Sequence, residues 1–359
     1  MKKLYFLILL CTILITQMLG QTTELSRFAA STPVSPYPIT IQQKDGSYLS
    51  IIGKGTQLSS WTETLDGYSV IRNNEIYEYA SVENGKLVPS GVKASDRKLR
   101  PNSETKFLER TPKFLKSELA DENTNGSFNS AQTFPNAASY SFPLSGNRKT
   151  ILLLIKYPDL PNTYSAATLT DMMNLSNYRG TGSFRDYYVK SSYGKLDVET
   201  DVFGWYTAAQ PYAYYGRQNG DARATKLVRE AIDAAEAAGV DFSKYDNDGN
   251  GSLDGVIVIH SGPGAEEGSQ NQYIWSHRWQ LVSGGNQVSN DGVFINDYII
   301  NPETRLFSGG IVGIGVFCHE FGHLLGLPDL YDISQVSEGV GEWSLMGGGG
   351  WLGGEHFAR

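Results

Sequence analysis

The feature that most constrains this chain is residues 318–332, which read CHEFGHLLGLPDLYD. They contain the pattern H-E-x-x-H, formed by His319, Glu320 and His323. Residues four apart on an α-helix lie on one face, so two histidines at this spacing can bind one Zn²⁺ from a rigid element. A carboxylate at position 320 can take a proton from a metal-activated water without binding the metal itself. The stretch therefore predicts a helix that carries a hydrolytic metal centre.

A catalytic zinc site usually takes three protein ligands and leaves one position for water. Gly326 can adopt the left-handed conformation that ends a helix, and Pro328 prevents the helix from resuming. Asp329 then stands where the pattern H-E-x-x-H-x-x-G-x-x-H has its third ligand. A carboxylate oxygen binds zinc, so we expect Asp329 to complete the set, although an aspartate after Leu-Pro is also a common turn residue. The alternative third ligands are Asp332, Glu338 and Glu342.

A methionine follows in a glycine-rich segment, residues 342–350, which reads EWSLMGGGG. Met346 stands where the same zinc-peptidase pattern has a methionine turn. For H-E-x-x-H alone, the alternative is a buried amphipathic helix whose histidines are satisfied by hydrogen bonds. Gly326, Asp329 and Met346 at their spacing favour the metal centre over that alternative.

These motifs resemble the metzincin clan of zinc peptidases and, within it, the M6 family of immune inhibitor A-like peptidases. The resemblance implies an α/β metzincin-like domain, with a twisted mixed sheet and an active-site helix, preceded by a small β-rich pro-domain. It implies that His319, His323 and Asp329 bind zinc, that Glu320 is the general base, and that Met346 forms the floor of the site. It also implies that the M6 domain continues beyond residue 359.

The N-terminus has the pattern of a secretory signal. Lys2 and Lys3 precede an apolar run from Leu4 to about Leu19. A membrane anchor is the alternative, but the run is short for a span and polar residues interrupt it. We expect cleavage near Gly20, a secreted extracellular protein, and no stable membrane association after cleavage.

Composition limits the classes of partner and the covalent links that this chain can have. The formal net charge is −8, which argues against a nucleic-acid partner. The two cysteines are Cys11 and Cys318, so the exported part has no intramolecular disulfide, and residues 21–317 have no thiol with which a pro-region could block a zinc ion. Oligomeric state is not specified by any of these features.

We predict four regions along the 359 residues: a signal peptide (1–20), a β-rich pro-region (21–100), a linker and activation segment (101–148), and a catalytic domain (149–359). Asp-Gly and Asn-Gly pairs at 45–46, 66–67 and 84–85 separate short apolar runs, as in antiparallel hairpins. Polar and small residues dominate the linker, where we expect activation cleavage between about 115 and 148.

Strand and helix patterns alternate in the catalytic domain, which favours an α/β fold. Buried strands are expected at 149–157 and 255–259, an alternating strand at 196–205, helices within 167–192, and an amphipathic helix at 221–238. By the metzincin resemblance, the alternating residues 293–300 are an edge strand that lines the cleft and binds an extended peptide. The alternative is an ordinary strand with both edges paired.

Residues 246–254, DNDGNGSLD, match the first part of a calcium-binding loop. The candidate ligands are Asp246, Asp248, Asn250 and Asp254. Ile257 stands where an EF-hand has its bidentate glutamate, and a strand follows instead of a helix, so this is not an EF-hand. A turn of Asp, Asn and Gly without an ion is the alternative.

A second group of titratable residues lies upstream of the zinc motif: His260, Glu266, Glu267 and His277. They are candidates for a second metal site, or His277 could orient the substrate, but packing and hydrogen-bonding roles are the preferred interpretation. The segment 275–279, WSHRW, also resembles M6 sequences.

We therefore expect a secreted zinc-dependent endopeptidase, made as a zymogen, that hydrolyses polypeptide substrates. One alternative is a catalytically inactive, peptidase-like binding protein with a structural metal site. Another is a zinc hydrolase that acts on non-peptide amides.

Overall fold

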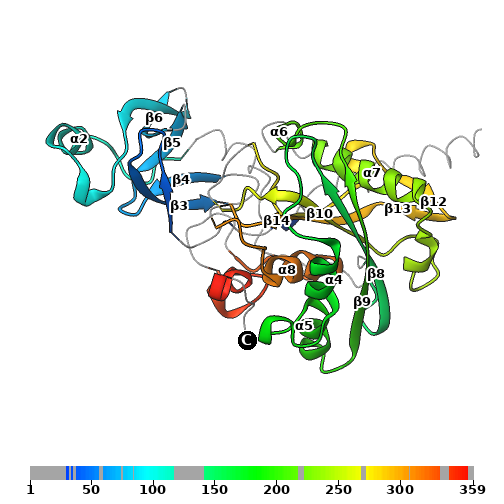
Figure 1. Cartoon of the computed structure of the whole chain (residues 1–359). Helices are drawn as coiled ribbons and strands as arrows, with labels where there is room; N and C mark the ends of the chain where they lie inside the picture. Colours follow the sequence, from blue (N-terminus) through cyan, green and yellow to red (C-terminus); the bar gives the residue numbers. More distant parts are fainter. Residues whose placement is uncertain are drawn as a thin grey trace, which may run out of the picture.

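The computed structural model describes residues 30–31, 34, 38–55, 60–73, 76–83, 85–116, 141–216, 222–267, 272–306, 308–331 and 339–354. These residues form two six-stranded sheets and one two-stranded sheet. One large sheet belongs to the N-terminal part of the chain, and the other packs against the helices of the C-terminal part (Figure 1). The protein is thus of the mixed α/β class that the sequence predicts.

The N-terminal sheet is an antiparallel meander in which each strand pairs with the next in the sequence. Its strands are β2 (Ile39–Gln42), β3 (Tyr48–Gly55), β4 (Ser60–Thr64), β5 (Ser69–Asn73), β6 (Ile76–Glu83) and β7 (Lys86–Lys93). Gly46 and Gly67 turn the chain with φ of 83° and 89°, which glycine adopts without strain. The predicted antiparallel β module is confirmed, although Asn84 of the third predicted turn lies outside the described residues.

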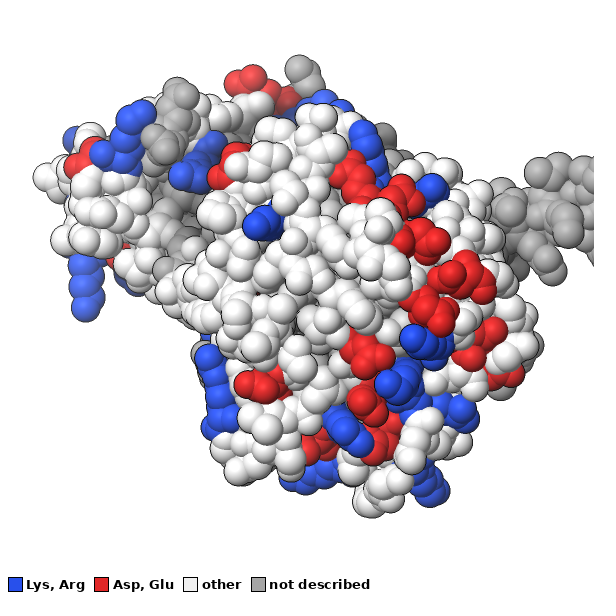
Figure 2. Space-filling model, turned by 45° about the vertical axis from the view of Figure 1, so that its right-hand side comes forward, with Lys and Arg blue, Asp and Glu red and all other residues white. Residues whose placement is uncertain are grey.

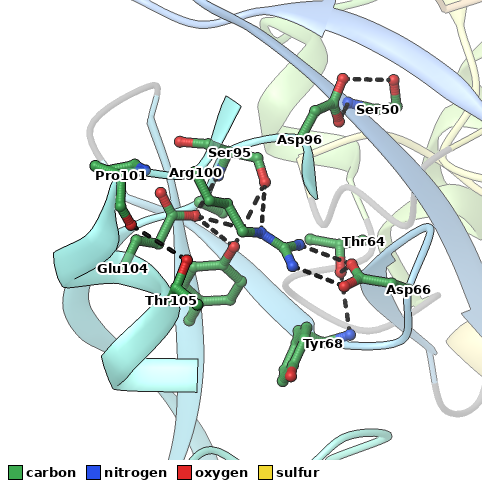
Figure 3. Close-up of polar contacts among 12 residues, drawn as sticks. Ser50, Thr64, Asp66, Tyr68, Ser95, Asp96, Arg100, Pro101, Glu104 and Thr105 are labelled. Atoms are coloured by element: carbon green, nitrogen blue, oxygen red, sulfur yellow. Dashed lines mark hydrogen bonds and ion pairs between the residues drawn. The ribbon is translucent and has the colours of Figure 1, made fainter. Parts of the chain in front are cut away.

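The segment after β7 packs back onto this sheet around a buried arginine. It contains η1 (Arg97–Leu99) and α2 (Asn102–Leu108). Arg100 donates two hydrogen bonds of 2.7 Å to the Asp66 carboxylate, and Glu104 of α2 lies 3.7 Å from the guanidinium. Figure 3 shows these three side chains meeting between α2 and the β4–β5 turn. Further along, the N–H of Phe114 donates to the Gly67 carbonyl, so the described chain stays on this sheet beyond α2.

The C-terminal sheet has the strand order β1-β11-β14-β10-β8-β9. Its strands are β1 (Ala30–Ser31), β8 (Gly146–Lys156), β9 (Leu196–Thr207), β10 (Val256–Pro263), β11 (His277–Gln280) and β14 (Asp297–Thr304). β9, β8, β10 and β14 are parallel, β11 runs antiparallel to β14, and β1 runs antiparallel to β11. The central strands are buried on both faces, which is why they read as continuous apolar runs.

Helices cover both faces of this sheet (Figure 1). On one face lies α7 (Ala222–Ala237), and on the other lie α4 (Ala166–Asn174), α5 (Phe184–Ser191) and α8 (Ile314–Leu324). The remaining elements are η3 (Tyr178–Gly180), α6 (Tyr212–Tyr215), η5 (Phe242–Tyr245), η6 (Leu281–Gly284), β12 (Val288–Asn290), β13 (Val293–Ile295), η7 (Gly341–Trp343) and η8 (Gly348–Gly354). The strands and helices predicted between residues 149 and 259 are confirmed to within a few residues at their ends.

The edge strand is not where the sequence predicted it. Residues 293–300 divide between β13, which pairs with β12, and β14, which has β10 on one side and β11 on the other. The prediction of a cleft-lining edge strand at 293–300 was therefore wrong. Alternation of polar and apolar residues indicates a strand but not its place in the sheet, and the strand beyond β14 is β11.

Charged side chains of both signs share the surface of the C-terminal part. Figure 2 shows Asp and Glu interspersed with Lys and Arg over the right and lower parts of one face. Ion pairs join Arg185 to Asp197, Arg229 to Asp233 and Lys149 to Asp201. Within the described residues, no helix is long and apolar enough to cross a membrane.

Candidate metal centre

Helix α8 carries the H-E-x-x-H residues, and all of its residues are buried. Phe317, Phe321 and Leu324 pack in the same hydrophobic core as the sheet strands, which fixes the helix against β11 and β14. His319 and His323 lie one turn apart, and their ring centroids are separated by 4.9 Å. The helix thus presents two imidazoles together from one buried side.

The chain turns back sharply where α8 ends. The N–H of Leu327 donates to the Gly322 carbonyl, and the N–H of Gly326 donates to the His323 carbonyl, both at 3.0 Å. This is the pair of hydrogen bonds of a Schellman motif, and Gly326 has the left-handed φ of 82° that the motif requires. The turn returns Asp329 to the side of the helix that carries both histidines, as the sequence predicts.

Three donor atoms converge at this place. The Nε2 atoms of His319 and His323 are 3.2 Å apart, and the Oδ1 atom of Asp329 lies 3.2 and 3.3 Å from them. In a tetrahedral site with metal–ligand distances of about 2.0–2.1 Å, ligand atoms are separated by about 3.3–3.4 Å. The donor set and its spacing therefore fit a zinc ion that keeps a fourth position.

Both imidazoles are held in one tautomer. His319 Nδ1 donates to the Leu345 carbonyl at 2.8 Å, and His323 Nδ1 donates to the Leu327 carbonyl at 2.7 Å. A proton on Nδ1 leaves the lone pair of Nε2 directed at the shared centre, and such backbone partners commonly orient metal-binding histidines. The two carbonyls thus prepare the rings for a cation.

The pKa values of His319 and Asp329 also favour a cation between these residues. Burial disfavours a charged imidazole, but the hydrogen bond to Asp329, together with the charges of Glu320 and Asp329, raises the pKa of His319 to about 9. Burial likewise disfavours the charged Asp329 carboxylate, but the two imidazoles hold its pKa below the usual range. A proton or a metal ion between the three groups balances the buried carboxylate.

Glu320 is buried on α8 beside the first histidine, and its charge contributes to the raised pKa of His319. Glu320 is outside the three-residue group whose ligand atoms converge, so its carboxylate lies near the centre without belonging to the donor set. That is the location a base for a hydrolytic reaction requires.

Met346 packs directly under the helix. A Cβ atom added to Gly322 would lie 2.7 Å from the sulfur of Met346, and one added to Gly315 would collide with the Gly350 carbonyl. Only glycines allow the segment after Leu345 to approach α8 this closely. The same approach brings the Leu345 carbonyl within hydrogen-bond distance of His319, so the segment that contains Met346 and the His319 ring are fixed together.

Residues 162–357 match the family described as immune inhibitor A peptidase M6, catalytic domain. The match covers more than half of the chain and includes His319, His323 and Asp329. The chain belongs to the M6 peptidase family. Among similar proteins, the pre-pro-metalloprotease PrtV of Vibrio cholerae serotype O1 is 34% identical over 258 residues, and the immune inhibitor A of Bacillus thuringiensis subsp. alesti is 32% identical over 207 residues.

The M6 relatives are much longer than the part they share with this chain. The alignments cover 57% and 48% of this chain but only 27% and 29% of the two relatives, respectively. The chain therefore spans little more than a quarter of the length of the relatives it matches.

A second group of candidate metal ligands, all aspartates, lies far from α8 in the sequence. Asp246, Asp248 and Asp254 each bring a carboxylate oxygen within 4.8 Å of the others. Asp254 is 2% exposed, its Oδ1 atom has no hydrogen-bond partner, and burial raises its pKa to about 6. Asn250 faces this group through a hydrogen bond to the Asp248 carboxylate. Backbone N–H groups of Asn250 and Gly251 donate to the Asp246 and Asp248 carboxylates, as in a turn, and the partnerless oxygen of Asp254 is the feature that favours an oxygen-coordinated cation.

The other predicted titratable residues are not assembled into a metal group within the described part of the chain. His277 contacts the Trp275 carbonyl and the Tyr298 hydroxyl, and His260 contacts the Ser261 carbonyl. The two glutamates are engaged elsewhere: Glu266 accepts from Ser276, and Glu267 pairs with Arg305. Their contacts agree with the preferred packing and hydrogen-bonding interpretation.

Of the alternative third ligands, Asp332 and Glu338 lie outside the described residues, and Glu342 is exposed and absent from the convergent group. Sequence reasoning missed the carbonyls of Leu345 and Leu327, because backbone acceptors leave no mark in a sequence. It also missed Tyr188, whose hydroxyl donates to the Cys318 carbonyl at 2.6 Å. Gly322, inside the motif, was a readable signal for close packing.

Proposed function

We propose that this chain contains the catalytic domain of a secreted zinc-dependent endopeptidase of metzincin type, made as a zymogen. The observation that carries the proposal is the convergence of His319, His323 and Asp329 at nearly tetrahedral spacing in a chain of the M6 family. The two relatives, a pre-pro-metalloprotease and an immune inhibitor A, agree with it.

His319, His323 and Asp329 hold the zinc ion in this proposal. When bound, zinc polarises the scissile carbonyl and acidifies a water molecule. Glu320 takes the proton of the attacking water and passes it to the leaving amine, a transfer for which its buried position beside His319 is suited. The substrate is a flexible polypeptide, and Met346 forms the floor of the site, where it packs against Gly322 of α8.

Secretion and latency rest on the N-terminal part. Residues 1–20 act as a signal peptide, residues 21–100 as a pro-region, and the segment 101–148 as the linker in which activation cleavage falls between about 115 and 148. N-terminal sequencing of the active form tests this assignment, and a mature start before residue 60 contradicts it.

Calcium is the cation we assign to the second group. Asp246, Asp248 and Asp254 supply carboxylates, and a buried oxygen of Asp254 lacks a partner, which a divalent ion satisfies. Calcium should raise the melting temperature of the chain. Asp254→Asn should abolish that increase and leave the zinc content unchanged, and an equal increase in the variant would refute the assignment.

The experiment that tests the hydrolase is a casein-degradation assay on the full chain after cleavage of its linker, with and without a zinc chelator. Glu320→Gln should lower the rate at least 10³-fold while one equivalent of zinc stays bound. Retained activity would remove Glu320 from its role. A zinc-bound wild-type chain without activity, even after cleavage of the linker, would favour the inactive binding protein.

Asp329→Ala tests the ligand set separately from activity. The variant should bind zinc at least tenfold more weakly in competition with a chelating dye, because two imidazoles alone must then hold the ion. Glu342→Ala is the matched control, since this exposed carboxylate lies outside the convergent group. If Glu342→Ala were the more damaging change, the third ligand would be misassigned.

A further inference from the structure

The outer edge of β11 is covered by the chain's own N-terminal segment. β1 pairs antiparallel with β11, Ala30 opposite Arg278 and Ser31 opposite His277. The other edge of β11 pairs with β14. Without β1, β11 would end the sheet and present a row of free backbone N–H and C=O groups.

This covered edge adjoins the metal centre. Both β11 and β1 lie against α8, the helix that carries the zinc-binding histidines. An extended polypeptide that paired with β11 would take the place of β1 against α8, held by main-chain hydrogen bonds that do not depend on its sequence. The edge is the surface on which a protease of broad substrate range can align a peptide.

A second contact holds the chain shortly after β1. The side chain of Val34 is buried and packs with Ala265 and Trp275, the latter just before β11. Its N–H donates to the Gly55 carbonyl of β3 at 3.3 Å. Val34, three positions after Ser31, thus lies between β3 of the N-terminal sheet and residues that follow β10 and precede β11.

We propose that β1 keeps the chain latent by occupying the backbone edge of β11 that an extended substrate needs. The inference rests on the proposed peptidase function and assigns the regulation of that site to Ala30 and Ser31. One strand edge accepts one partner, and a tethered segment competes at an effective concentration near the millimolar range. A substrate at micromolar concentration is then excluded from β11.

The element that blocks the site is then a strand and not an additional metal ligand. Among the described residues, the donors that converge on the centre are His319, His323 and Asp329, all from the M6 domain. Activation of the zymogen then requires two separate events. Cleavage after Lys116 cuts the covalent link to the N-terminal sheet, but β1 stays on β11 until it dissociates.

The test uses the full chain with Ala30→Pro and Ser31→Pro together, which removes both N–H groups of β1. The matched control exchanges the two side chains, Ala30→Ser with Ser31→Ala, and leaves the backbone intact. Both are made with Glu320→Gln, so that binding is measured without hydrolysis. The probe is fluorescein-labelled casein, and its affinity is measured by anisotropy at equal zinc content.

The proline variant should bind the probe at least tenfold more tightly than the exchange control. Equal affinities overturn the proposal. In chains that keep Glu320, the proline variant should also digest casein at least tenfold faster. Tighter binding without digestion would contradict the proposed peptidase function and leave the strand proposal standing.

Hydrogen exchange provides a second measurement that does not depend on substrate. The amides of His277–Gln280 that do not bond to β14 should be protected in the parent chain and should exchange faster in the proline variant. Val34→Asp disrupts the second contact. If neither this change nor the two proline substitutions alters the protection of these amides, β1 does not cover this edge.

Discussion

At the scale of single residues, the candidate metal centre depends on backbone carbonyls and a glycine that lie outside the three donor residues. The Leu345 and Leu327 carbonyls fix the tautomers of the two histidines, and Gly322 lets Met346 reach the helix backbone. A donor set of correct types is of little use if its rings can rotate, because each free rotation lowers the affinity for the ion. The supporting contacts are therefore as testable as the ligands.

Gly322→Ala should damage the centre without altering any ligand. The new methyl group would lie 2.7 Å from the Met346 sulfur and would push the methionine turn away from α8. We expect a loss of about 1–3 kcal/mol in stability and weaker zinc binding, measured by thermal unfolding and by dye competition. Gly322→Ala with Met346→Ala should lose less than the sum of the single changes, and strict additivity would contradict the contact.

His260 should make the protein sensitive to acid. Burial lowers its pKa to about 4, so the folded chain holds it neutral, whereas the unfolded chain takes up a proton near pH 6.5. Its contribution to stability is therefore complete above pH 6.5 and is lost as the pH falls toward 4.

Urea unfolding at pH 7.5 and pH 5.5 measures this effect. His260→Asn keeps a donor for the Ser261 carbonyl and removes the titration. Between these two pH values the parent chain should lose about 1.4 kcal/mol more than the variant. An equal loss in both would show that His260 is not held neutral.

At the scale of elements, the end of α8 decides the position of Asp329, the proposed third ligand. The Schellman hydrogen bonds and the left-handed Gly326 turn the chain through Pro328 and back to the histidines. A helix that continued for one more turn would carry Asp329 away from them. This is a local property, and for that reason the sequence could predict it.

Gly326→Ala should weaken zinc binding by straining that turn. A Cβ atom at φ of 82° costs about 1 kcal/mol, and the strain is relieved by moving Asp329. Gly326→Asn is the matched control, because asparagine tolerates the left-handed region. Dye competition should rank the zinc affinities as parent, Asn variant, then Ala variant, and an Ala variant equal to the parent would show that the turn does not position Asp329.

At the scale of the whole molecule, the N-terminal sheet and the catalytic sheet have separate hydrophobic cores. Leu49, Ile51 and Tyr79 centre one of them, while α7 and α8 pack onto the other sheet. The N-terminal core is small and is extended by the polar network of Arg100, Asp66 and Glu104. Each core should therefore respond to mutations of its own.

Arg100→Met should destabilise the N-terminal sheet and spare the metal centre. It leaves the Asp66 carboxylate without the guanidinium that lowers its pKa to about 2, at a cost of about 2 kcal/mol. Limited proteolysis should show faster cleavage within residues 38–116, with unchanged zinc stoichiometry. Adding Asp66→Asn should restore part of the loss, and no restoration would mean that the ion pair is not the source.

Much of the candidate site was predictable, because its chemistry is encoded over short distances. The spacing of His319 and His323, the helix-ending Gly326 and the return to Asp329 follow from helix and turn geometry. So do the antiparallel hairpins and the buried strands of the catalytic sheet. The pairing of the three donor residues is thus a property of one segment of about ten residues.

Strand order was decided by the tertiary structure alone. Residues 293–300 read as an edge strand, yet β14 is paired on both sides, and β11, the next strand outward, is itself paired with β1 from the N-terminal part of the chain. Periodicity reports which side chains are buried, but it does not report which backbone lies alongside. That depends on the packing of segments far apart in sequence. The local motif therefore determined which three donor residues come together, and only the folded chain decided which strands pair next to β11.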